Sequence, residues 1–232
     1  MNYVTDDTMN AYLRSVQPMY DGVLGEIQKE AIAAEVPIVP PEVARLLSVL
    51  LTMQKPKNIL EIGTAVAFSA GLMCRYLPEE GTVTTIDRYE VMLKDARVNI
   101  KRMGLEDKIK ILEGDAADIL PTLEGPYDVI FMDAAKGQYQ AFLPHCLRLL
   151  PIGGLLIVDY VLQGGTIAQT RFSVPRRQRT IHKRLRNFLW EITHHDALET
   201  SIIPIGDGVA LCYKKKEIIP ETKTEGETKN AE

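Results

Sequence analysis

From residue 58 onward, short apolar runs rich in β-branched residues alternate with longer segments whose apolar positions recur with helical spacing. This alternation is typical of βαβ units, in which helices join parallel strands. Five runs fit buried strands: NILEI (58–62), TVTTID (82–87), IKILEG (109–114), YDVIFMD (127–133) and GLLIVD (154–159). The pattern therefore predicts an open, mostly parallel sheet.

Between these runs, apolar residues recur with the periodicity of an α-helix. The expected helices cover residues 68–77, 89–103, 116–123 and 138–150, and a long basic helix covers 176–195. Residues 7–54 also have helical character, interrupted at Pro37, Pro40 and Pro41. Near the end, LETSIIPI and GVALCYKK are two strands separated by Gly206-Asp207-Gly208, which favours an antiparallel hairpin. We therefore expect a doubly wound, Rossmann-like α/β fold with a seven-stranded sheet, an antiparallel last strand and N-terminal helices.

Each of the five strands ends at, or just before, an acidic residue. These residues are Glu61, Asp87, Asp115, Asp133 and Asp159. The carboxyl ends of parallel strands lie at one edge of a sheet, and ligands of open α/β folds bind outside that edge. The sequence therefore predicts a carboxylate-rich crevice.

The composition fits one globular domain of ordinary size. The 232 residues are 46% apolar and 25% charged, with a formal net charge of −4. We expect a single domain over residues 1–215 and a charged, disordered tail over 216–232, where both signs of charge mix with few apolar residues. Cys74, Cys146 and Cys212 lie in apolar segments, which favours reduced core residues over a disulfide framework.

No stretch approaches the roughly 20 apolar residues that cross a bilayer, and the polar N-terminus lacks the regions of a signal peptide. We therefore expect a cytoplasmic protein with no membrane partner. The net charge argues against binding polyanions over the whole surface, but one segment is strongly basic. Residues 171–186 carry seven Lys or Arg and no acid. This segment could contact phosphates, or it could be the solvated face of a helix.

The first strand leads into EIGTAVAFSAG, which resembles a nucleotide-binding turn but has Ala65 and Phe68 in place of its second and third glycines. An acid before Gly63 would repel a phosphate, whereas it suits a cationic amino group. Asp87 follows Gly63 by 24 residues, where a carboxylate can accept hydrogen bonds from both ribose hydroxyls. A positively charged nucleoside without phosphate describes S-adenosylmethionine. Taken singly, Gly63 could equally be a tight turn and Asp87 a helix N-cap.

Five stretches carry a family resemblance: EIGTAVAFSA, TIDR, GDA, FMDAAKGQYQ and IVDYVL. In this order they resemble the motifs of S-adenosylmethionine-dependent class I O-methyltransferases of the catechol and caffeoyl-CoA type, over about residues 35–214. The block DAAKGQYQ, the basic segment and the ending IIPIGDGVAL are most similar to the bacterial tRNA 5-hydroxyuridine methyltransferases, which complete 5-methoxyuridine in the anticodon loop. The resemblance implies a methyltransferase fold, S-adenosylmethionine as cofactor and a homodimer.

The resemblance also implies which residues hold the methyl donor. Its ribose would be bound by Asp87, and its adenine would be flanked by Asp115 and Ala116. Asp133 would lie close to the methyl group. The methionine portion would be held by Glu61, Gly63, Thr64 and Ser69, with Val39 contributing from the N-terminal segment.

By the same resemblance, Asp133 would be the first metal ligand and Asp159 the second. Lys136 would lie next to the acceptor, as a base or as a cation that stabilises an oxyanion. Lys136 could instead be a surface lysine paired with Asp133. On this reading the catalytic residues are Lys136 and Asp133.

Two positions depart from the family pattern. After the fifth strand that pattern is Asp-Asn, both Mg²⁺ ligands, whereas this chain has Asp159-Tyr160. Because a neutral phenol is a poor ligand for this hard cation, we expect Mg²⁺ to bind weakly through Asp133, Asp159 and waters, or not at all. Ala67 stands where relatives usually have glycine. If its φ is positive, alanine costs on the order of 1 kcal/mol.

The leading hypothesis is methylation of 5-hydroxyuridine in tRNA, with phosphates bound by Arg171, Arg176, Arg177 and Arg179 and the target base splayed into the crevice. A catechol-type small phenol is the second, since both acceptors offer two adjacent oxygens that can chelate Mg²⁺. The third is a nucleoside-binding protein that has lost catalysis, suggested by Tyr160 and Ala67.

The expected basic helix also contains residues that could suggest a site. His182, His194 and His195 lack ligand spacing with a carboxylate, so we expect surface or capping roles for them. Leu185, Phe188 and Trp190 fit the buried stripe of that helix.

Overall fold

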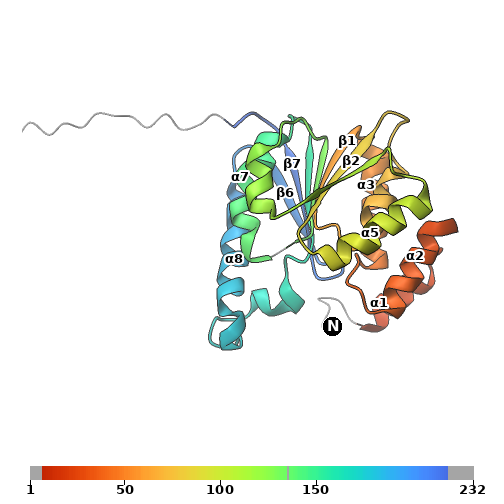
Figure 1. Ribbon diagram of the computed structural model, residues 1–232. Coiled ribbons are helices and arrows are strands. Elements are labelled where there is room, and N and C mark those ends of the chain that lie inside the picture. The colour runs from red at the N-terminus through yellow and green to blue at the C-terminus, as the bar shows by residue number, and fades with distance from the viewer. Residues whose placement is uncertain (1–6, 135, 219–232) are drawn as a thin grey trace, which may run out of the picture.

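A computed structural model describes residues 7–134 and 136–218. Its sheet has seven strands in the order β3-β2-β1-β4-β5-β7-β6 (Figure 1). Neighbours among the first five are parallel, and β7 runs antiparallel to both β5 and β6. The strands are β1 (Asn58–Ile62), β2 (Thr82–Asp87), β3 (Ile109–Glu113), β4 (Val129–Met132), β5 (Leu155–Val158), β6 (Leu198–Ile203) and β7 (Val209–Lys214). This confirms the predicted fold class and hairpin.

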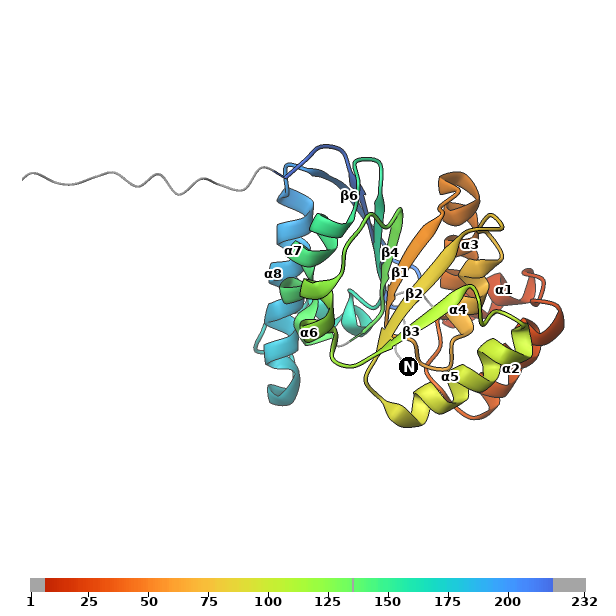
Figure 2. The ribbon, with the colours of Figure 1, turned by 45° about the horizontal axis from the view of Figure 1, so that its top comes forward.

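Helices cover both faces of the sheet (Figure 2). One side carries α1 (Asp7–Ser15), α2 (Gly22–Ala33), α3 (Pro41–Gln54), α4 (Phe68–Cys74) and α5 (Glu90–Met103), and the other carries α6 (Ala116–Ile119), α7 (Tyr139–Leu149) and α8 (Arg179–His194). Short 3-10 turns are η1 (Leu120–Thr122), η2 (Lys136–Gln138), η3 (Gln163–Ala168) and η4 (Arg176–Gln178). No helix within the described ranges is long and apolar enough to cross a membrane.

Two hydrophobic clusters, one on each face, hold the layers together. Successive side chains of a strand point to opposite faces, so Ile59 of β1 joins one cluster while Leu60 and Ile62 join the other. Helices α2 to α5 pack on the first cluster and α7 and α8 on the second. The cysteines confirm their predicted role, since all three are buried and free. The core thus fixes the sheet between two helical layers.

Several helix boundaries differ from the predictions. The helix expected over 68–77 ends at Cys74, and the one expected over 116–123 is a four-residue α6 followed by a 3-10 turn that contains Pro121. The N-terminal segment also breaks at residues 16–21, around Pro18, because proline cannot donate the helical hydrogen bond. Pro41, by contrast, is the first residue of α3, a position where that missing donor costs nothing.

The register brings the acidic strand ends to one edge of the sheet. The amide of Asp133 donates to the carbonyl of Ile62 at 2.9 Å, and the amide of Asp159 donates to that of Met132 at 3.0 Å. On the other side of β1, the amide of Gly63 donates to the carbonyl of Ile86 at 2.9 Å. The carboxyl ends of β1, β2, β4 and β5 therefore lie at one edge of the sheet, as predicted.

The predicted tail falls mostly outside the described residues. Of the range 216–232, the structure describes Lys216, Glu217 and Ile218, which belong to neither helix nor strand. Lys216 Nζ lies 3.6 Å from a carboxylate oxygen of Asp196. The expected disorder of the rest of the tail stays a prediction.

Candidate active site

A cavity of about 1,100 Å³ opens at the carboxyl edge of the sheet. Its walls come from the ends of β1, β2, β3 and β4 and from the N-terminal segment between α2 and α3. The lining includes residues 35–41, 62–65, 86–89, 114–116 and 133–134, together with Lys136 and Tyr160. This is the position where open α/β sheets bind ligands.

The cavity brings together eight of the nine residues predicted to hold the methyl donor. Glu61 is the exception, because its side chain is fully buried behind the wall. The eight lining residues are Val39, Gly63, Thr64, Ser69, Asp87, Asp115, Ala116 and Asp133.

The turn after β1 has a strained backbone that brings it against β4. Gly63 has φ 111°, and a Cβ added there would collide with the carbonyl oxygen of Asp133. Ala65 and Ala67 have φ 43° and 63°, so the positive φ suspected at Ala67 is confirmed. An L-residue with a side chain is disfavoured in this conformation by roughly 1–2 kcal/mol. Only glycine satisfies both demands at position 63.

The carboxylate of Asp87 holds this turn in place. Its Oδ2 accepts hydrogen bonds from the amides of Thr64 and Ala65, each at 3.0 Å. Its Oδ1 accepts from the amides of Arg88 and Tyr89 at 2.7 and 3.0 Å. Asp87 therefore ties the end of β2 to the turn after β1, in addition to facing the cavity.

Glu61 forms the end of a buried chain of hydroxyl groups. The Thr85 hydroxyl donates to Glu61 Oε2 at 2.6 Å, and the Thr64 hydroxyl lies 2.7 Å from that of Thr85. Oε1 of Glu61 has no hydrogen-bond partner in the part of the chain described. Burial raises the pKa of Glu61 to about 8, opposed by the nearby hydroxyls of Ser69 and Thr85. A cationic group of a ligand would favour its ionised form.

An ion pair lies in the cavity wall that follows β2 and β3. Arg88 Nη1 lies 2.6 Å from Oδ2 of Asp115, and the guanidinium also lies 5.3 Å from the ring centre of Tyr89. Asp115 caps α6 by accepting from the amide of Ala117 at 2.9 Å. That hydrogen bond and Arg88 lower the pKa of Asp115. The N-cap role that the sequence suggested for Asp87 is thus found at Asp115, whereas the N-cap residue of α5 is Tyr89.

Two further acids meet where β4 and β5 end. Burial raises the pKa of Asp133 to about 6, which Lys136 opposes, and burial together with the charge of Asp133 raises the pKa of Asp159 well above its usual value. Oδ1 of Asp159 accepts from the amide of Tyr160 at 2.7 Å, while Oδ2 is buried without a partner among the described residues. Asp159 does not line the cavity. The next residue, Tyr160, lines the cavity instead.

Lys136 reaches this acidic end from η2. Its Nζ lies 3.8 Å from Oδ2 of Asp207 and 3.6 Å from the ring centre of Tyr160. The side chain is 31% exposed, so it is not a fully solvated surface lysine. Burial lowers the pKa of Lys136, opposed by Asp207, Asp133 and Asp159.

Asp207 is a neighbour of Lys136 that sequence reasoning missed. It belongs to the turn between β6 and β7, is 6% exposed, and pairs with Lys136 rather than facing solvent. The sequence Gly206-Asp207-Gly208 by itself predicts only a turn. The available signal was an acid in a hairpin turn that, given the antiparallel β7, reaches the same edge as the ends of the parallel strands.

The residues present do not fit the Mg²⁺ site that the resemblance implies. The implied ligands are Asp133, Asp159 and an asparagine directly after Asp159, and this chain has Tyr160 in place of that asparagine. The orphaned oxygen of Asp159 could be one ligand, but the next residue is Tyr160, whose ring faces a lysine ammonium. A cation already stands beside the carboxylates, and a phenol is a poor ligand for Mg²⁺.

The four arginines predicted to bind RNA lie in two kinds of environment. Arg171, Arg176 and Arg177 are exposed. Arg179 is half-buried, and its guanidinium donates to the carbonyls of Val174 at 3.0 Å and Phe172 at 3.4 Å. Arg179 therefore holds the loop before α8 instead of projecting fully into solvent.

Two expectations for α8 need correction. His182 is buried rather than at the surface, and its Nε2 lies 3.2 Å from the carbonyl oxygen of Gln169. Trp190 is 65% exposed and stacks on His194 with ring centres 4.3 Å apart, while Leu185 and Phe188 are buried as predicted. The apolar stripe of α8 is narrower than the helical pattern suggested, since i+2 positions do not share a face with Phe188.

The fold and a cavity at the carboxyl ends of its parallel strands define a protein of the Rossmann-like α/β class. A family described as O-methyltransferase matches residues 16–215, and the chain belongs to that family. The chain is 30% identical over 223 residues to a catechol O-methyltransferase of Niastella koreensis, covering 93% of this chain and all of that protein. It is 32% identical over 182 residues to a caffeoyl-CoA O-methyltransferase of Populus kitakamiensis, covering 76% and 77%.

Solved structures agree with this assignment. A putative caffeoyl-CoA O-methyltransferase from Staphylococcus aureus is similar with a TM-score of 0.83 and 31% identity, covering 90% of this chain and 100% of that one. An O-methyltransferase from Bacillus cereus in complex with SAH is similar with a TM-score of 0.78 and 27% identity, covering 90% and 97%. The protein is an S-adenosylmethionine-dependent O-methyltransferase of the catechol and caffeoyl-CoA type.

Proposed function

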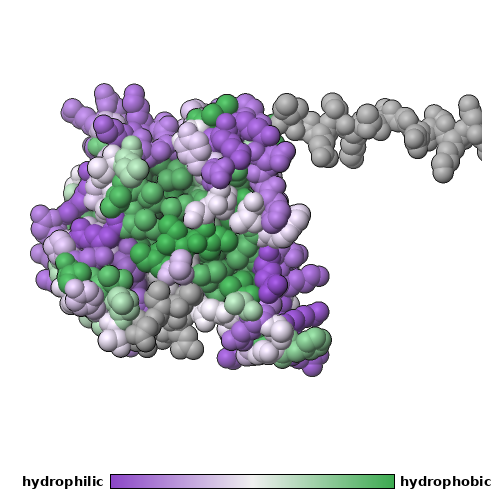
Figure 3. All heavy atoms as spheres, turned by 180° about the vertical axis from the view of Figure 1, so that it is seen from behind, coloured by the Kyte–Doolittle hydropathy of each residue, from purple (hydrophilic) through white to green (hydrophobic). Residues whose placement is uncertain are grey.

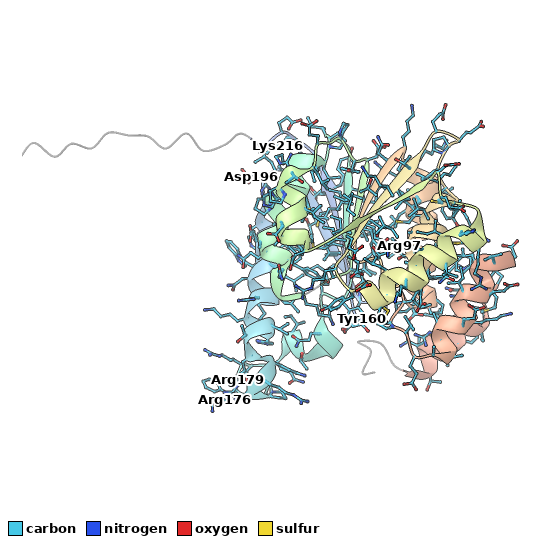
Figure 4. The ribbon with its side chains drawn as sticks, in the orientation of Figure 1. Arg97, Tyr160, Arg176, Arg179, Asp196 and Lys216 are labelled. Carbon is cyan, nitrogen blue, oxygen red and sulfur yellow. The ribbon has the colours of Figure 1, made fainter. Side chains whose placement is uncertain are left out.

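We propose that this enzyme methylates the 5-hydroxyl of 5-hydroxyuridine in the anticodon loop of tRNA. The observation that supports the acceptor is the basic end of α8. Figure 4 shows Arg176 and Arg179 near the free end of that helix, at the same end of the molecule as Tyr160. Arg171, Arg176 and Arg177 are exposed and no acid lies between residues 171 and 186. Exposed arginines of this kind bind phosphates of a nucleic-acid backbone.

Helix α8 contacts the segment that carries Lys136, a residue that lines the cavity. Nη1 of Arg184 donates to the carbonyl of Gly137 at 3.0 Å, and Gly137 is the neighbour of Lys136. An RNA loop held by the exposed arginines would thus have a cavity within reach for a splayed base. Asp133 and Lys136 would act on the base, while the nucleoside of the donor would occupy the part of the cavity near Asp87.

A small phenol of the catechol type is the second candidate, favoured by the names of the relatives. Catechol and caffeoyl-CoA O-methyltransferases are 30–32% identical to this chain. The cavity of about 1,100 Å³ exceeds the roughly 300–1,000 Å³ of sites for one drug-sized ligand, so donor and a small ring fit together. Net charge −4 also favours a partner that is not a large polyanion.

One assay separates these candidates. The protein is incubated with labelled S-adenosylmethionine and either tRNA that lacks the 5-methoxy group or a panel of catechols, over a range of salt concentrations. With three phosphate contacts, tRNA affinity should fall roughly 20-fold for a fourfold rise in salt, whereas a neutral phenol should hardly respond.

The matched variant replaces Arg171, Arg176 and Arg177 with glutamine. It should lose tRNA affinity and most of its salt dependence while donor binding stays unchanged. Methylation of catechols but not of tRNA would contradict the tRNA proposal and favour the second candidate. Donor binding without transfer to any acceptor would favour the third hypothesis, a nucleoside-binding protein that has lost catalysis.

We also propose that the enzyme is a homodimer and cytoplasmic. Figure 3 shows a broad apolar area at the centre of one face of the molecule. Exposed apolar side chains also occur on α3, where Val49 and Met53 are 56% and 76% exposed. Large exposed apolar patches commonly mark protein interfaces. Light scattering during size-exclusion chromatography tests the dimer, and a monomeric mass at micromolar concentration would contradict it.

A further inference from the structure

The ammonium group of Lys136 is held from two sides by residues outside its own segment. The ring of Tyr160, which follows β5, lies with its centre 3.6 Å from Nζ, and Oδ2 of Asp207, from the β6–β7 turn, lies 3.8 Å from it. Lys136 and Tyr160 both line the cavity, and Asp207 is buried behind them. A lysine side chain has several rotatable bonds, so two such contacts restrict where its charge can lie.

Asp207 is fixed in this position by the hairpin turn and the loop after β5. Its Oδ1 accepts from the amide of Gly164, and its carbonyl accepts from the amide of Leu162 at 2.9 Å. Gly208, with φ 87°, has no room for a Cβ beside Leu162. These contacts hold the hairpin against the loop that carries Tyr160, so Asp207 cannot turn away from Lys136 without opening them.

Tyr160 adopts a backbone conformation that is costly for its residue type. Its φ is 63°, and its amide donates to Oδ1 of Asp159 at 2.7 Å. A non-glycine residue in this region costs roughly 1–2 kcal/mol, and such strain concentrates at functional sites. The conformation places the aromatic face against the lysine ammonium, an attractive arrangement for a partly desolvated cation.

We propose that Lys136, oriented by Tyr160 and Asp207, is the resident cation of this active site and stabilises the acceptor oxyanion, so that methyl transfer needs no divalent metal. The proposal rests on the O-methyl transfer described above and holds for either acceptor. Lys136 is the catalytic residue, because its ammonium would contact the reacting oxygen. Tyr160 and Asp207 are positioning residues that act through it.

The reaction balances without a further co-reactant. The acceptor hydroxyl releases its proton to water, and the oxygen anion is held by the Lys136 ammonium. The oxygen then attacks the methyl carbon of the sulfonium in line with the departing sulfur. The new C–O bond forms as the C–S bond breaks, and the electron pair of that bond stays on sulfur, which becomes a neutral thioether.

If one ammonium activates the acceptor in place of a metal chelate, the enzyme should accept a wider range of phenols. A divalent metal activates a hydroxyl best when a second, adjacent oxygen completes the chelate. An ammonium contacts the oxyanion alone and gains nothing from the neighbour. Phenols with one hydroxyl should therefore react within about an order of magnitude of catechols of similar acidity.

The first test measures metal dependence in two ways, by the binding of the metal ion and by the rate of methyl transfer. Mg²⁺ and Mn²⁺ are titrated by calorimetry into the protein saturated with S-adenosylhomocysteine, and transfer to both acceptors is measured with and without EDTA. We expect no binding heat into the low-millimolar range and the same rate in EDTA. Binding of either ion, or a rate lost in EDTA and restored by Mg²⁺, would overturn the inference while leaving the O-methyltransferase function intact.

The second test uses variants of the three residues. Lys136→Met should lower kcat by a factor of about 10²–10³, the usual effect of removing one oxyanion-stabilising group. Tyr160→Ala and Asp207→Asn should each lower kcat about 2- to 30-fold, with donor affinity changed less than about twofold. Tyr160→Phe, which keeps the ring, should recover most of the kcat lost in Tyr160→Ala. Lys94→Met, at an exposed position of α5, is the matched control and should behave as the parent enzyme.

Folding is checked for each variant by its melting temperature and by donor binding. Asp207→Asn retains the acceptor for the Gly164 amide and replaces only the charge, so it tests the inference if Tyr160→Ala loses stability. An unchanged kcat in Lys136→Met, or equal losses in Tyr160→Ala and Tyr160→Phe, would overturn the inference. Donor binding with no transfer to any acceptor in the parent enzyme would instead overturn the proposed function.

Discussion

The hydroxyl of Thr85 donates a 2.6 Å hydrogen bond to Oε2 of Glu61. The residues face each other in the paired register of β1 and β2, and both are fully buried. The Thr64 hydroxyl, 2.7 Å from that of Thr85, extends the chain into the turn that lines the cavity. A buried polar network of this kind is worth more intact than the sum of its parts.

Thr85→Val should lower the free energy of unfolding by about 1–3 kcal/mol. The substitution keeps the shape of the side chain but leaves a buried carboxyl oxygen of Glu61 without its partner. Urea unfolding measures the change, and a double-mutant cycle with Thr64→Val should give a coupling energy of at least about 0.5 kcal/mol. Thr84→Val, half-buried on the other face of the strand, is the control and should change stability by less than about 0.5 kcal/mol. Equal effects at the two positions would exclude the network.

Glu61→Gln should change how stability depends on pH. The folded pKa of Glu61 is about 8, above the value of 4.5 expected for an unfolded chain. The native state therefore favours the protonated form of Glu61. The contribution of Glu61 to the free energy of unfolding is fully present below about pH 4.5 and is lost as pH rises toward 8.

The glutamine variant does not titrate, so relative to the parent it should gain up to about 1.4 kcal/mol for each pH unit in this window. Urea unfolding at pH 5, 6, 7 and 8 measures the difference, with Glu80→Gln in an exposed turn as the control. If the difference in the free energy of unfolding between variant and parent is the same at all four pH values, Glu61 does not titrate in this window.

The turn after β1 offers a matched pair of alanines. Both Ala65 and Ala67 have positive φ, but Ala67 is fully buried and Ala65 is half-buried. Replacement by glycine relieves about 1–2 kcal/mol of strain and costs about 0.5–1 kcal/mol in unfolded-state entropy. At Ala67 it also removes a buried methyl group worth about 0.8 kcal/mol.

Ala65→Gly should therefore stabilise the protein by about 0.5 kcal/mol, whereas Ala67→Gly should be close to neutral. Thermal or urea unfolding of the two variants in parallel gives the comparison. Greater stabilisation from Ala67→Gly would mean that strain at position 67 exceeds the value of its buried methyl group.

The fold and the crevice could be predicted because both follow from local sequence. Period and β-branched runs locate the strands, and an acid after each run needs only the rule that parallel strands end at one edge. The site at Lys136 could not be predicted in the same way. It depends on Asp207, which reaches the edge from a distant hairpin and contacts Gly164 and Leu162, and on the positive φ of Tyr160.

The burial of individual side chains was also difficult to predict from the sequence. Glu61 is predicted to hold the methionine portion of the donor; its carboxyl is buried against Thr85 and does not line the cavity, and that role stays a prediction. Trp190 and His182 were assigned the wrong environments because helical periodicity gives the centre of an apolar face but not its width.

The arginines around α8 divide into structural and exposed groups, and this division can be tested. Arg179→Ala removes donations to the carbonyls of Val174 and Phe172, so it should lower the free energy of unfolding by about 1–2 kcal/mol. Arg176→Ala, at an exposed position, should change it by less than about 0.5 kcal/mol. If tRNA is the acceptor, Arg176→Ala should instead weaken tRNA binding and reduce the slope of log affinity against log salt by about one. Melting curves and a salt series for both variants distinguish the groups, because a stability loss in Arg176→Ala without any change in the salt slope would assign that arginine to the loop and remove it from the proposed RNA surface.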